Sequence, residues 1–284
     1  MGKLVYAAKV THVPTMLLSE MDGSLKGCRQ AAIDGHKEIG RRVREAGADT
    51  VVVLDTHWLV NAAYHINANH SFKGVFTSNE FPQFIKDMDY AYEGNAALGD
   101  LIAEKAQVKG VNAMSHQVDS LELEYGTLVP MRYMNEERDL KVVSIAAWCT
   151  VHSHASSRKL GEAIREAIEA SDNNVALVAS GSLSHKIWPN DIYAENNGTF
   201  TISSEFNQQV DLRVLDLWQK GDFATFVKML PDYANYCDGE GDMHDTVMLL
   251  GALGWDKYEG KAEVITDYFP SSGTGQTNVV FPLD

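Results

Sequence analysis

Three histidines each follow an apolar run in this sequence. His12 stands in "VTHVPTML", His57 in "VVVLDTHW" and His185 in "VALVASGSLSH". Neutral imidazole binds Zn, Fe, Cu and Ni, and it also transfers protons near neutral pH. The plainer alternative is that each histidine is a hydrogen-bonded residue at a strand end. The repeated Thr-His ending of the first two segments favours a shared role for His12 and His57 as metal ligands.

A carboxylate would complete such a site, because two histidines and one carboxylate on one face of Fe(II) leave positions open for a substrate and O₂. The sequence has no His-Glu-x-x-His or Cys-x-x-Cys motif, so the ligands must come from distant segments. The segment "NYCDGEGDMHD" offers Glu240 and Asp242 before an apolar helix. Acidic residues also favour helix N-termini, but capping does not account for the glycines on both sides of Glu240.

Two histidines are candidates for proton transfer. His185 follows a Gly/Ser-rich turn and is predicted to be a general base. The turn does not match Gly-x-Ser-x-Gly, so a serine nucleophile is not indicated. His116 stands before a short loop in "SHQVDSLELEYGTLVP", which continues to Tyr125-Gly126. Taken alone, His116 reads as an ordinary loop histidine.

Alternating apolar runs and helical periodicity define the elements that position these residues. Strands are expected at residues 4–10, 50–54, 140–147, 174–179, 263–268 and 278–281, with 62–66 as an extension or hairpin partner of 50–54. Helices are expected at residues 25–46, 94–106, 156–170, 203–219, 223–230 and 242–253. This alternation predicts an α/β fold with a mainly parallel or mixed central sheet flanked by helices. The functional crevice of such sheets lies at the carboxyl ends of the strands, where His12, His57 and His185 are expected to meet.

Composition and charge exclude several classes of function. The chain has 284 residues and a net charge of −15, which argues against binding to nucleic acid or to an anionic membrane surface. No run of eighteen apolar residues is present, and the N-terminal apolar segment is too short for a secretory signal. Three scattered cysteines fit reduced thiols in a cytoplasm. We therefore expect a cytoplasmic protein with one domain, residues 1–284.

Five segments, taken in order, resemble the class III extradiol ring-cleavage dioxygenases of the protocatechuate 4,5-dioxygenase type. They are the first Thr-His, the "DTHW", the His-x-x-Asp…Tyr-Gly…Val-Pro segment, the "GSLSH" turn, and a late Glu before an apolar helix ending in Gly-Ala-Leu. This order is more specific than any one motif and extends through most of the chain. Within the family, the chain is most similar to members that act on 3,4-dihydroxyphenylacetate (homoprotocatechuate).

The resemblance implies a non-haem Fe(II) site with His12, His57 and Glu240 as ligands, and Asp242 is the alternative carboxylate. It also implies that His185 and His116 are the acid/base histidines, although many members carry His-Gly where this chain has Tyr125-Gly126. The implied reaction is extradiol (meta) cleavage of a catechol by O₂ to a ring-opened semialdehyde, in the catabolism of aromatic compounds. The family further implies a homo-oligomer.

Two other functions could use the same residues. A zinc-dependent hydrolase could use the three ligands to generate hydroxide. A non-catalytic binding protein could retain the fold without the reaction. The presence of all five candidate residues together favours the dioxygenase. The sequence does not identify the residue that would bind an acidic side chain of the substrate. Lys186, next to His185, is the cation adjacent to the expected site.

Overall fold

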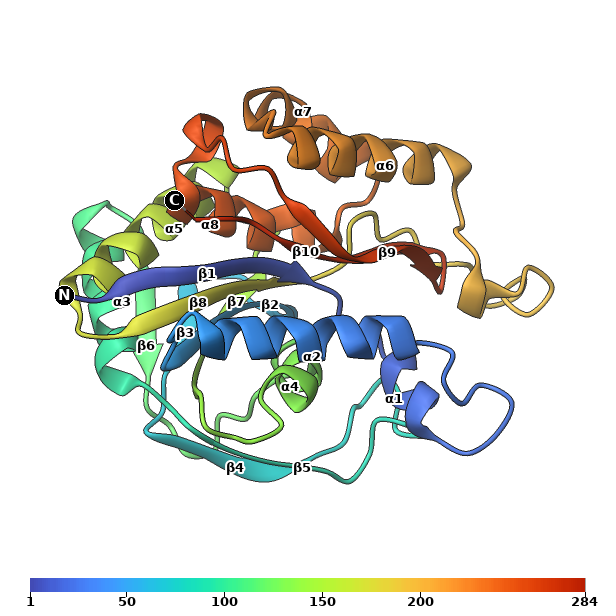
Figure 1. The fold of residues 1–284 in the computed structure, drawn as a ribbon, viewed down its shortest axis with the longest axis horizontal. Helices are drawn as coiled ribbons and strands as arrows, with labels where there is room; N and C mark the ends of the chain where they lie inside the picture. The colour runs from blue at the N-terminus through green and yellow to red at the C-terminus, as the bar shows by residue number, and fades with distance from the viewer. Residues whose placement is uncertain (284) are drawn as a thin grey trace.

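Four parallel strands form the centre of the computed structural model, which describes residues 1–283. They lie side by side in the order β7 (Lys141–Trp148), β2 (Thr50–Leu59), β8 (Asn174–Ser180) and β1 (Lys3–Val10). Their residues are almost continuously apolar because helices cover both faces of the sheet (Figure 1). Ser180 pairs with both Val10 and Asp55, so the carboxyl ends of β1, β2 and β8 are level.

Four shorter or antiparallel strands extend the sheet on both sides, in the overall order β6-β3-β7-β2-β8-β1-β10-β9. The added strands are β3 (Tyr64–Asn67), β6 (Ala113–His116), β9 (Glu263–Ser271) and β10 (Thr274–Val280). On one side β10 is antiparallel to β1, and on the other β3 is antiparallel to β7. Because β6 is parallel to β3, both strands at that edge run opposite to the central four.

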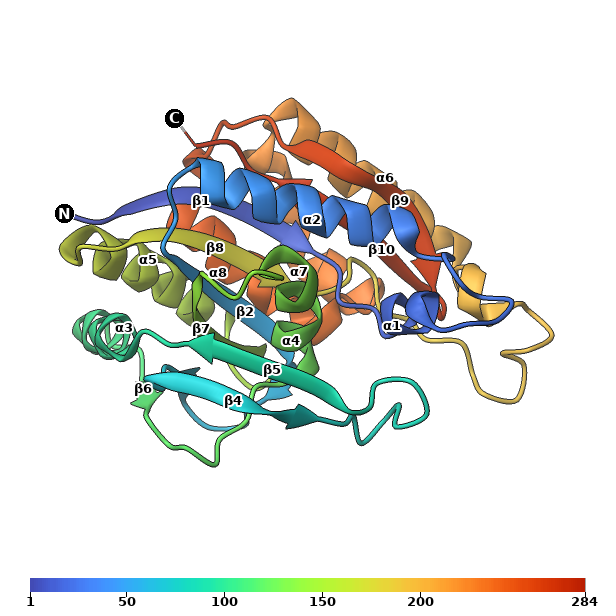
Figure 2. The same cartoon turned by 60° about the horizontal axis from the view of Figure 1, so that its bottom comes forward.

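Helices and a separate hairpin cover the two faces of the sheet (Figures 1 and 2). One apolar core holds residues from α3 (Ala96–Val108), α5 (His154–Ala170), α6 (Glu205–Lys220), α7 (Phe223–Tyr236) and α8 (His244–Leu253). The core of the other face holds residues from α1 (Thr15–Glu20), α2 (Gln30–Glu45), α4 (Tyr125–Met134), β4 (Ser71–Phe76) and β5 (Met88–Glu93). Three short 3₁₀ turns complete the chain: η1 (Gly198–Phe200), η2 (Glu240–Met243) and η3 (Trp255–Lys257). No helix within residues 1–283 has both the length and the apolar character needed to cross a bilayer.

The predicted α/β class with a mixed sheet is confirmed, but several elements differ from the sequence-based expectations. The segment 62–66 does not pair with 50–54, because β3 lies between β6 and β7 while β2 lies between β7 and β8. The first long helix begins at Gln30, after turns that occupy the start of the range 25–46. A short loop follows His116, as expected, but it leads into α4, a helix that was not predicted and in which Pro130 is accommodated. The hairpin β4–β5 and the edge strand β6 were not predicted.

Candidate metal centre

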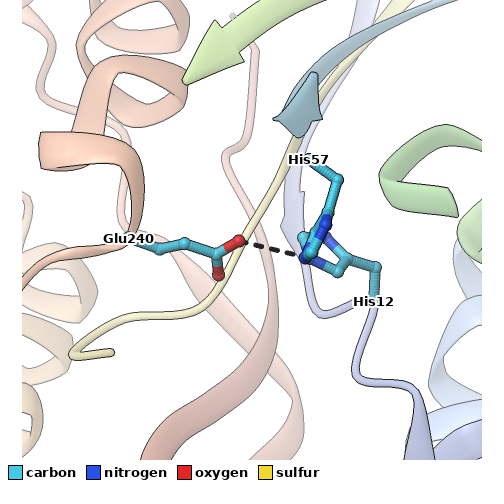
Figure 3. Close-up of side chains that lie close together, drawn as sticks. All are labelled: His12, His57 and Glu240. Atoms are coloured by element: carbon cyan, nitrogen blue, oxygen red, sulfur yellow. Dashed lines mark ion pairs between the residues drawn. The ribbon is translucent and has the colours of Figure 1, made fainter. Parts of the chain in front are cut away.

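His12, His57 and Glu240 come together at the carboxyl end of the parallel strands. Each contributes one ligand atom to a group whose atoms all lie within 4.8 Å of one another (Figure 3). His12 follows β1, and His57 lies just beyond Asp55, the last residue of β2 that pairs with β8. The Nε2 atom of His12 is 3.2 Å from Oε1 of Glu240. The structure thus brings the three predicted ligands together, and the meeting of His12 and His57 agrees with the strand-end argument.

A buried carboxylate orients the segment that carries His57. Asp55 accepts hydrogen bonds from the backbone N–H of His57 at 2.7 Å and from the hydroxyl of Thr127 at 2.6 Å. Thr127 belongs to α4, so this helix anchors the end of β2. A Cβ atom at Gly126 would lie 2.1 Å from Oδ1 of Asp55. The glycine at this position therefore provides space for the carboxylate that orients His57.

A strained turn presents Glu240 to the two histidines. Gly241, Asp242 and Met243 have φ values of 54°, 55° and 63°, in the left-handed region that non-glycine residues rarely adopt. The Glu240 carboxylate accepts hydrogen bonds from the Thr56 hydroxyl and the Ser182 backbone N–H. Backbone strain of this kind persists only where the surrounding contacts enforce it, and it concentrates at functional sites.

The same turn separates Asp242 from the cluster. Asp242 is not among the residues whose ligand atoms meet, and its backbone carbonyl lies 2.8 Å from Nε2 of His154. Between the two carboxylates considered from the sequence, the geometry favours Glu240. Glu240 is 1% exposed, so its charge acts on the imidazoles without solvent screening.

The cluster shifts the pKa of each member. Burial acts to raise the pKa of Glu240, but the neighbouring imidazoles of His12 and His185 outweigh it and hold the pKa well below its usual range. Burial acts to lower the pKa of His12, but the Glu240 carboxylate outweighs it and the pKa is raised. Burial and the nearby His12 both lower the pKa of His57. Of the three side chains, His12 is therefore the one whose protonated form the Glu240 carboxylate favours, whereas burial favours the neutral form of His57.

Metal binding should release one proton and weaken as the pH falls. A metal needs neutral His12, whose pKa is raised, whereas His57 is already neutral and Glu240 already ionised. Affinity should therefore fall by about tenfold per pH unit below the pKa of His12, which lies above its ordinary value of 6.5. Anaerobic calorimetric titration with Fe(II) or Zn(II) in buffers of different ionisation enthalpy would measure the protons released. Equal affinity at pH 6 and pH 8 would contradict this prediction.

His185 lies beside the cluster, on a turn held by buried contacts. Its Nε2 atom is 4.0 Å from Oε2 of Glu240, and its backbone N–H donates to the carbonyl of Asp238 at 2.8 Å. The preceding residue, Ser184, donates its hydroxyl to the buried carboxylate of Asp211 at 2.7 Å. His185 is thus close enough to act on a molecule in the site without being needed as a third imidazole ligand.

Tyr125 is a functional candidate that the reasoning from residue types did not select. Its ring centroid is 3.6 Å from that of His57, and its hydroxyl contacts Nε2 of His57. The hydroxyl also lies 3.3 Å from Oε2 of Glu80. Burial and the Glu80 charge raise the pKa of Tyr125, so its hydroxyl keeps its proton. The available signal was the family resemblance, which singled out the Tyr125-Gly126 segment.

The structure does not bring His116 to the cluster. Its Nε2 lies 2.7 Å from Nδ1 of His65, and the two rings stack with centroids 5.0 Å apart. His116 ends β6, which runs antiparallel to the central strands, so the carboxyl end of β6 points away from the rim that carries His12. Three strand spacings, about 14 Å, separate β6 from β2. The acid/base role that the family resemblance implied for His116 therefore does not fit its position in the structure.

A cavity of about 430 Å³ opens beside the metal ligands. His12, His57, Tyr125 and His185 line one part of it. Its apolar lining residues include Leu18, Phe81, Phe84 and Ile187. This mixture of apolar walls and a few converging polar groups is typical of a small-molecule site.

The donor set fits a divalent metal of the first transition series. Imidazole suits Zn, Cu, Fe and Ni, and two imidazoles with one carboxylate form the ligand set of non-haem Fe(II) oxygenases. The ligand atoms face one another, and both histidines also line the cavity. A small molecule in the cavity would therefore have direct access to a metal held by these residues.

Comparison with known proteins places the chain in a family. Residues 6–282 match the model for the catalytic LigB subunit of aromatic ring-opening dioxygenase. The chain is 61% identical over 261 residues to 3,4-dihydroxyphenylacetate 2,3-dioxygenase of Escherichia coli, covering 92% of this chain and 94% of that protein. It is 24% identical over 203 residues to the 2-aminophenol 1,6-dioxygenase beta subunit of a Pseudomonas species, covering 67% of this chain and 65% of that subunit.

A solved structure shows the same fold at low sequence identity. The crystal structure of an uncharacterised protein from Escherichia coli K12 superposes with a TM-score of 0.62 and 13% identity, covering 98% of this chain and all of that one. The family resemblance inferred from the ordered motifs is confirmed, because the matches extend over nearly the whole chain. The chain belongs to the LigB family, the catalytic subunits of aromatic ring-opening dioxygenases.

Proposed function

We propose that the protein is an Fe(II)-dependent extradiol dioxygenase that cleaves 3,4-dihydroxyphenylacetate. The carbon–carbon bond between one hydroxylated ring carbon and its non-hydroxylated neighbour breaks. Both atoms of O₂ are incorporated into the ring-opened semialdehyde. The observation that carries the proposal is the His12–His57–Glu240 group beside an apolar cavity. The substrate is proposed because the highly similar Escherichia coli protein is a 3,4-dihydroxyphenylacetate 2,3-dioxygenase. We further propose that residues 1–284 form one catalytic domain.

The metal would be held by His12, His57 and Glu240. When bound there, Fe(II) would supply adjacent coordination positions for the catechol oxygens and O₂, so that the reactants are held together. Glu240 would contribute the negative charge that balances the ion. The hydrogen bonds from Thr56 and Ser182 would orient its carboxylate, as outer contacts commonly do for metal ligands.

His185 is proposed as the base for the catechol. It lines the cavity next to Glu240, and a neutral imidazole there can accept a proton from a substrate hydroxyl. Phe81 and Phe84 line the same cavity and can confine the aromatic ring. The role of His185 is therefore to take up a proton at Nε2 and to return it once the ring has opened.

Tyr125, rather than His116, is proposed as the second residue that assists the reaction, as a hydrogen-bond donor. Its hydroxyl retains a proton and lies at the cavity surface beside His57. It can donate a hydrogen bond to an oxygen that gains negative charge during the reaction. His116 lacks this position, because it faces His65 at the sheet edge. Proton donation by His116, expected from the sequence, is not supported by its placement.

A panel of catechols offered to the reconstituted protein tests the proposed function. The protein, loaded anaerobically with Fe(II) and then exposed to O₂, should form a yellow ring-opened product. Its kcat/KM should be roughly 10- to 100-fold higher for 3,4-dihydroxyphenylacetate than for catechol, the range expected for one charged hydrogen bond. Oxygen uptake and product absorbance measure both rates. Hydrolytic activity with Zn(II), without O₂ uptake with Fe(II), would favour the zinc hydrolase instead.

The cellular setting is also a proposal. Cys28, Cys149 and Cys237 are free thiols in the structure, which fits a reducing cytoplasm. Cys149 and Cys237 are buried. Assembly into a homo-oligomer stays a prediction from the family.

A further inference from the structure

The cavity beside the candidate metal centre has no lysine or arginine among the described residues of its wall. Among residues 1–283, the side chains that line it include neither lysine nor arginine, and the acidic one is Glu80, next to Tyr125. Lys186, the cation considered from the sequence, is exposed and does not line the cavity. In a chain with a net charge of −15, an anionic substrate side chain requires a local positive partner.

Arg29 lies directly behind one wall of this cavity. Its residue is only 6% exposed. Its Nε donates to Oγ1 of Thr15 at 3.0 Å, and its Nη2 donates to the carbonyl oxygen of Thr199. Thr15 and Thr199 both line the cavity, although Arg29 itself does not. One layer of side chain and backbone therefore separates the guanidinium from the cavity.

Arg29 has no acidic partner within residues 1–283. The two hydrogen bonds of its guanidinium go to neutral oxygens, and its Cζ lies 5.1 Å and 5.0 Å from the ring centroids of Phe200 and Phe269. Arg29 also lines a separate hollow of about 330 Å³, and Asp267, the carboxylate that lines this hollow, forms no ion pair with it. Buried charges in proteins are normally paired, because an unpaired one carries a large desolvation cost. This arrangement leaves its charge available to an anion on the cavity side.

Hydroxyl groups form the part of the wall that Arg29 supports. We call Thr15, Tyr193, Thr199, Ser271 and Ser272 the hydroxyl wall; all five line the cavity. Because Oγ1 of Thr15 accepts from Arg29, its own proton points elsewhere, and Oγ of Ser271 lies 3.2 Å away. The Tyr193 hydroxyl lies 3.1 Å from Oγ of Ser272. These groups can turn their protons toward a carboxylate in the cavity.

We propose that Arg29, acting through the hydroxyl wall, selects substrates that carry an anionic side chain. The proposal rests on the function proposed above and adds the residue that recognises the carboxylate. The catechol ring would lie against the metal ligands and His185, and its carboxylate would face the hydroxyl wall. Attraction across one layer of protein is effective because the buried guanidinium is shielded from water. Arg29 is therefore a specificity-determining residue and takes no part in the chemical step.

Variants at Arg29 test this with a matched pair of substrates. The substrates are 3,4-dihydroxyphenylacetate and its neutral amide, and the quantity compared is the ratio of their kcat/KM values. Arg29→Met should lower this ratio roughly 10- to 100-fold, through a higher KM for the acid. Arg29→Lys retains the charge and should restore most of the preference. Arg165→Met, which removes an exposed arginine that pairs with Glu169 on α5, is the matched control.

Each result decides a different question. An unchanged ratio in a folded, iron-loaded Arg29→Met variant would overturn the proposal for Arg29, while the proposed function would stand. Equal wild-type efficiency on acid and amide would overturn carboxylate recognition as a whole. No cleavage of either compound by the wild type would overturn the proposed function and this inference with it. If Arg29→Met does not fold, Thr15→Val carries the test, and a ratio equal to that of the wild type would overturn the proposal.

Discussion

Replacing Glu240 by glutamine should strip the metal from the protein, whereas replacing Asp242 by asparagine should leave it bound. Glu240 lies 3.2 Å from His12 and is buried, so its charge is the negative counterpart of the site. Asp242 lies outside the ligand group. The loss in affinity for Glu240→Gln should exceed the 10- to 100-fold typical of changes to outer contacts of a metal site. Metal content after desalting, measured by elemental analysis, compares the two variants.

The glutamine variant isolates the charge from the fold. Its side-chain carbonyl can still accept a hydrogen bond from Thr56 or Ser182, so the turn that carries it keeps part of its support. His12→Ala and His57→Ala should also lose metal, and the melting temperature of each metal-free variant controls for unfolding. Full metal occupancy in Glu240→Gln, together with loss in Asp242→Asn, would make Asp242 the third ligand.

His185→Phe and Tyr125→Phe should keep the metal but lower turnover by roughly 10²- to 10⁴-fold, the usual contribution of a positioned acid or base. Both side chains line the cavity, and neither belongs to the group of ligand atoms. His116→Phe is the matched control, because His116 contacts His65 at the sheet edge. It should turn over at a near-normal rate. A loss of 10²-fold or more in a folded, metal-loaded His116→Phe would restore the role expected from the sequence.

The two cavity variants should fail at different stages. Without His185, catechol deprotonation should be impaired, and the optical change on anaerobic substrate binding should diminish. Without the Tyr125 hydroxyl, that change should persist and a step after O₂ addition should slow. Anaerobic spectra and single-turnover kinetics on both variants distinguish these stages. Loss of metal from His185→Phe would place His185 among the ligands. Normal turnover in either variant would show that the replaced residue has no role in the reaction.

Much of the architecture follows from sequence patterns that report burial. The apolar runs of β1, β2, β7 and β8 are continuous because both faces of these strands are covered. Such runs can be recognised in a single sequence. Periodicity reports burial but not strand direction. The antiparallel β3 and β6 were therefore not recognised as a reversed edge, and the position of His116 at that edge could not be inferred.

The helix α4 shows a second limit. Its segment includes Pro130, which usually argues against a helix, and nine of its ten residues are buried, so no polar face marks its periodicity. Tertiary packing overrides the local preference here. Because α4 was not anticipated, neither the support that Thr127 gives to Asp55 nor the position of Tyr125 could be inferred.

By itself, the sequence predicted the fold class, the two histidines of the candidate metal site and the segment that carries its carboxylate. These depend on local order: a buried strand followed by Thr-His, and an acidic Gly-rich turn before an apolar helix. Only the tertiary structure decided between Glu240 and Asp242, because consecutive left-handed residues set which side chain faces the histidines. It also placed Arg29 behind Thr15 and Thr199, residues up to 170 positions apart in the chain. Contacts of such separation leave no pattern in a single sequence, because they arise only when the helices and loops pack against the sheet.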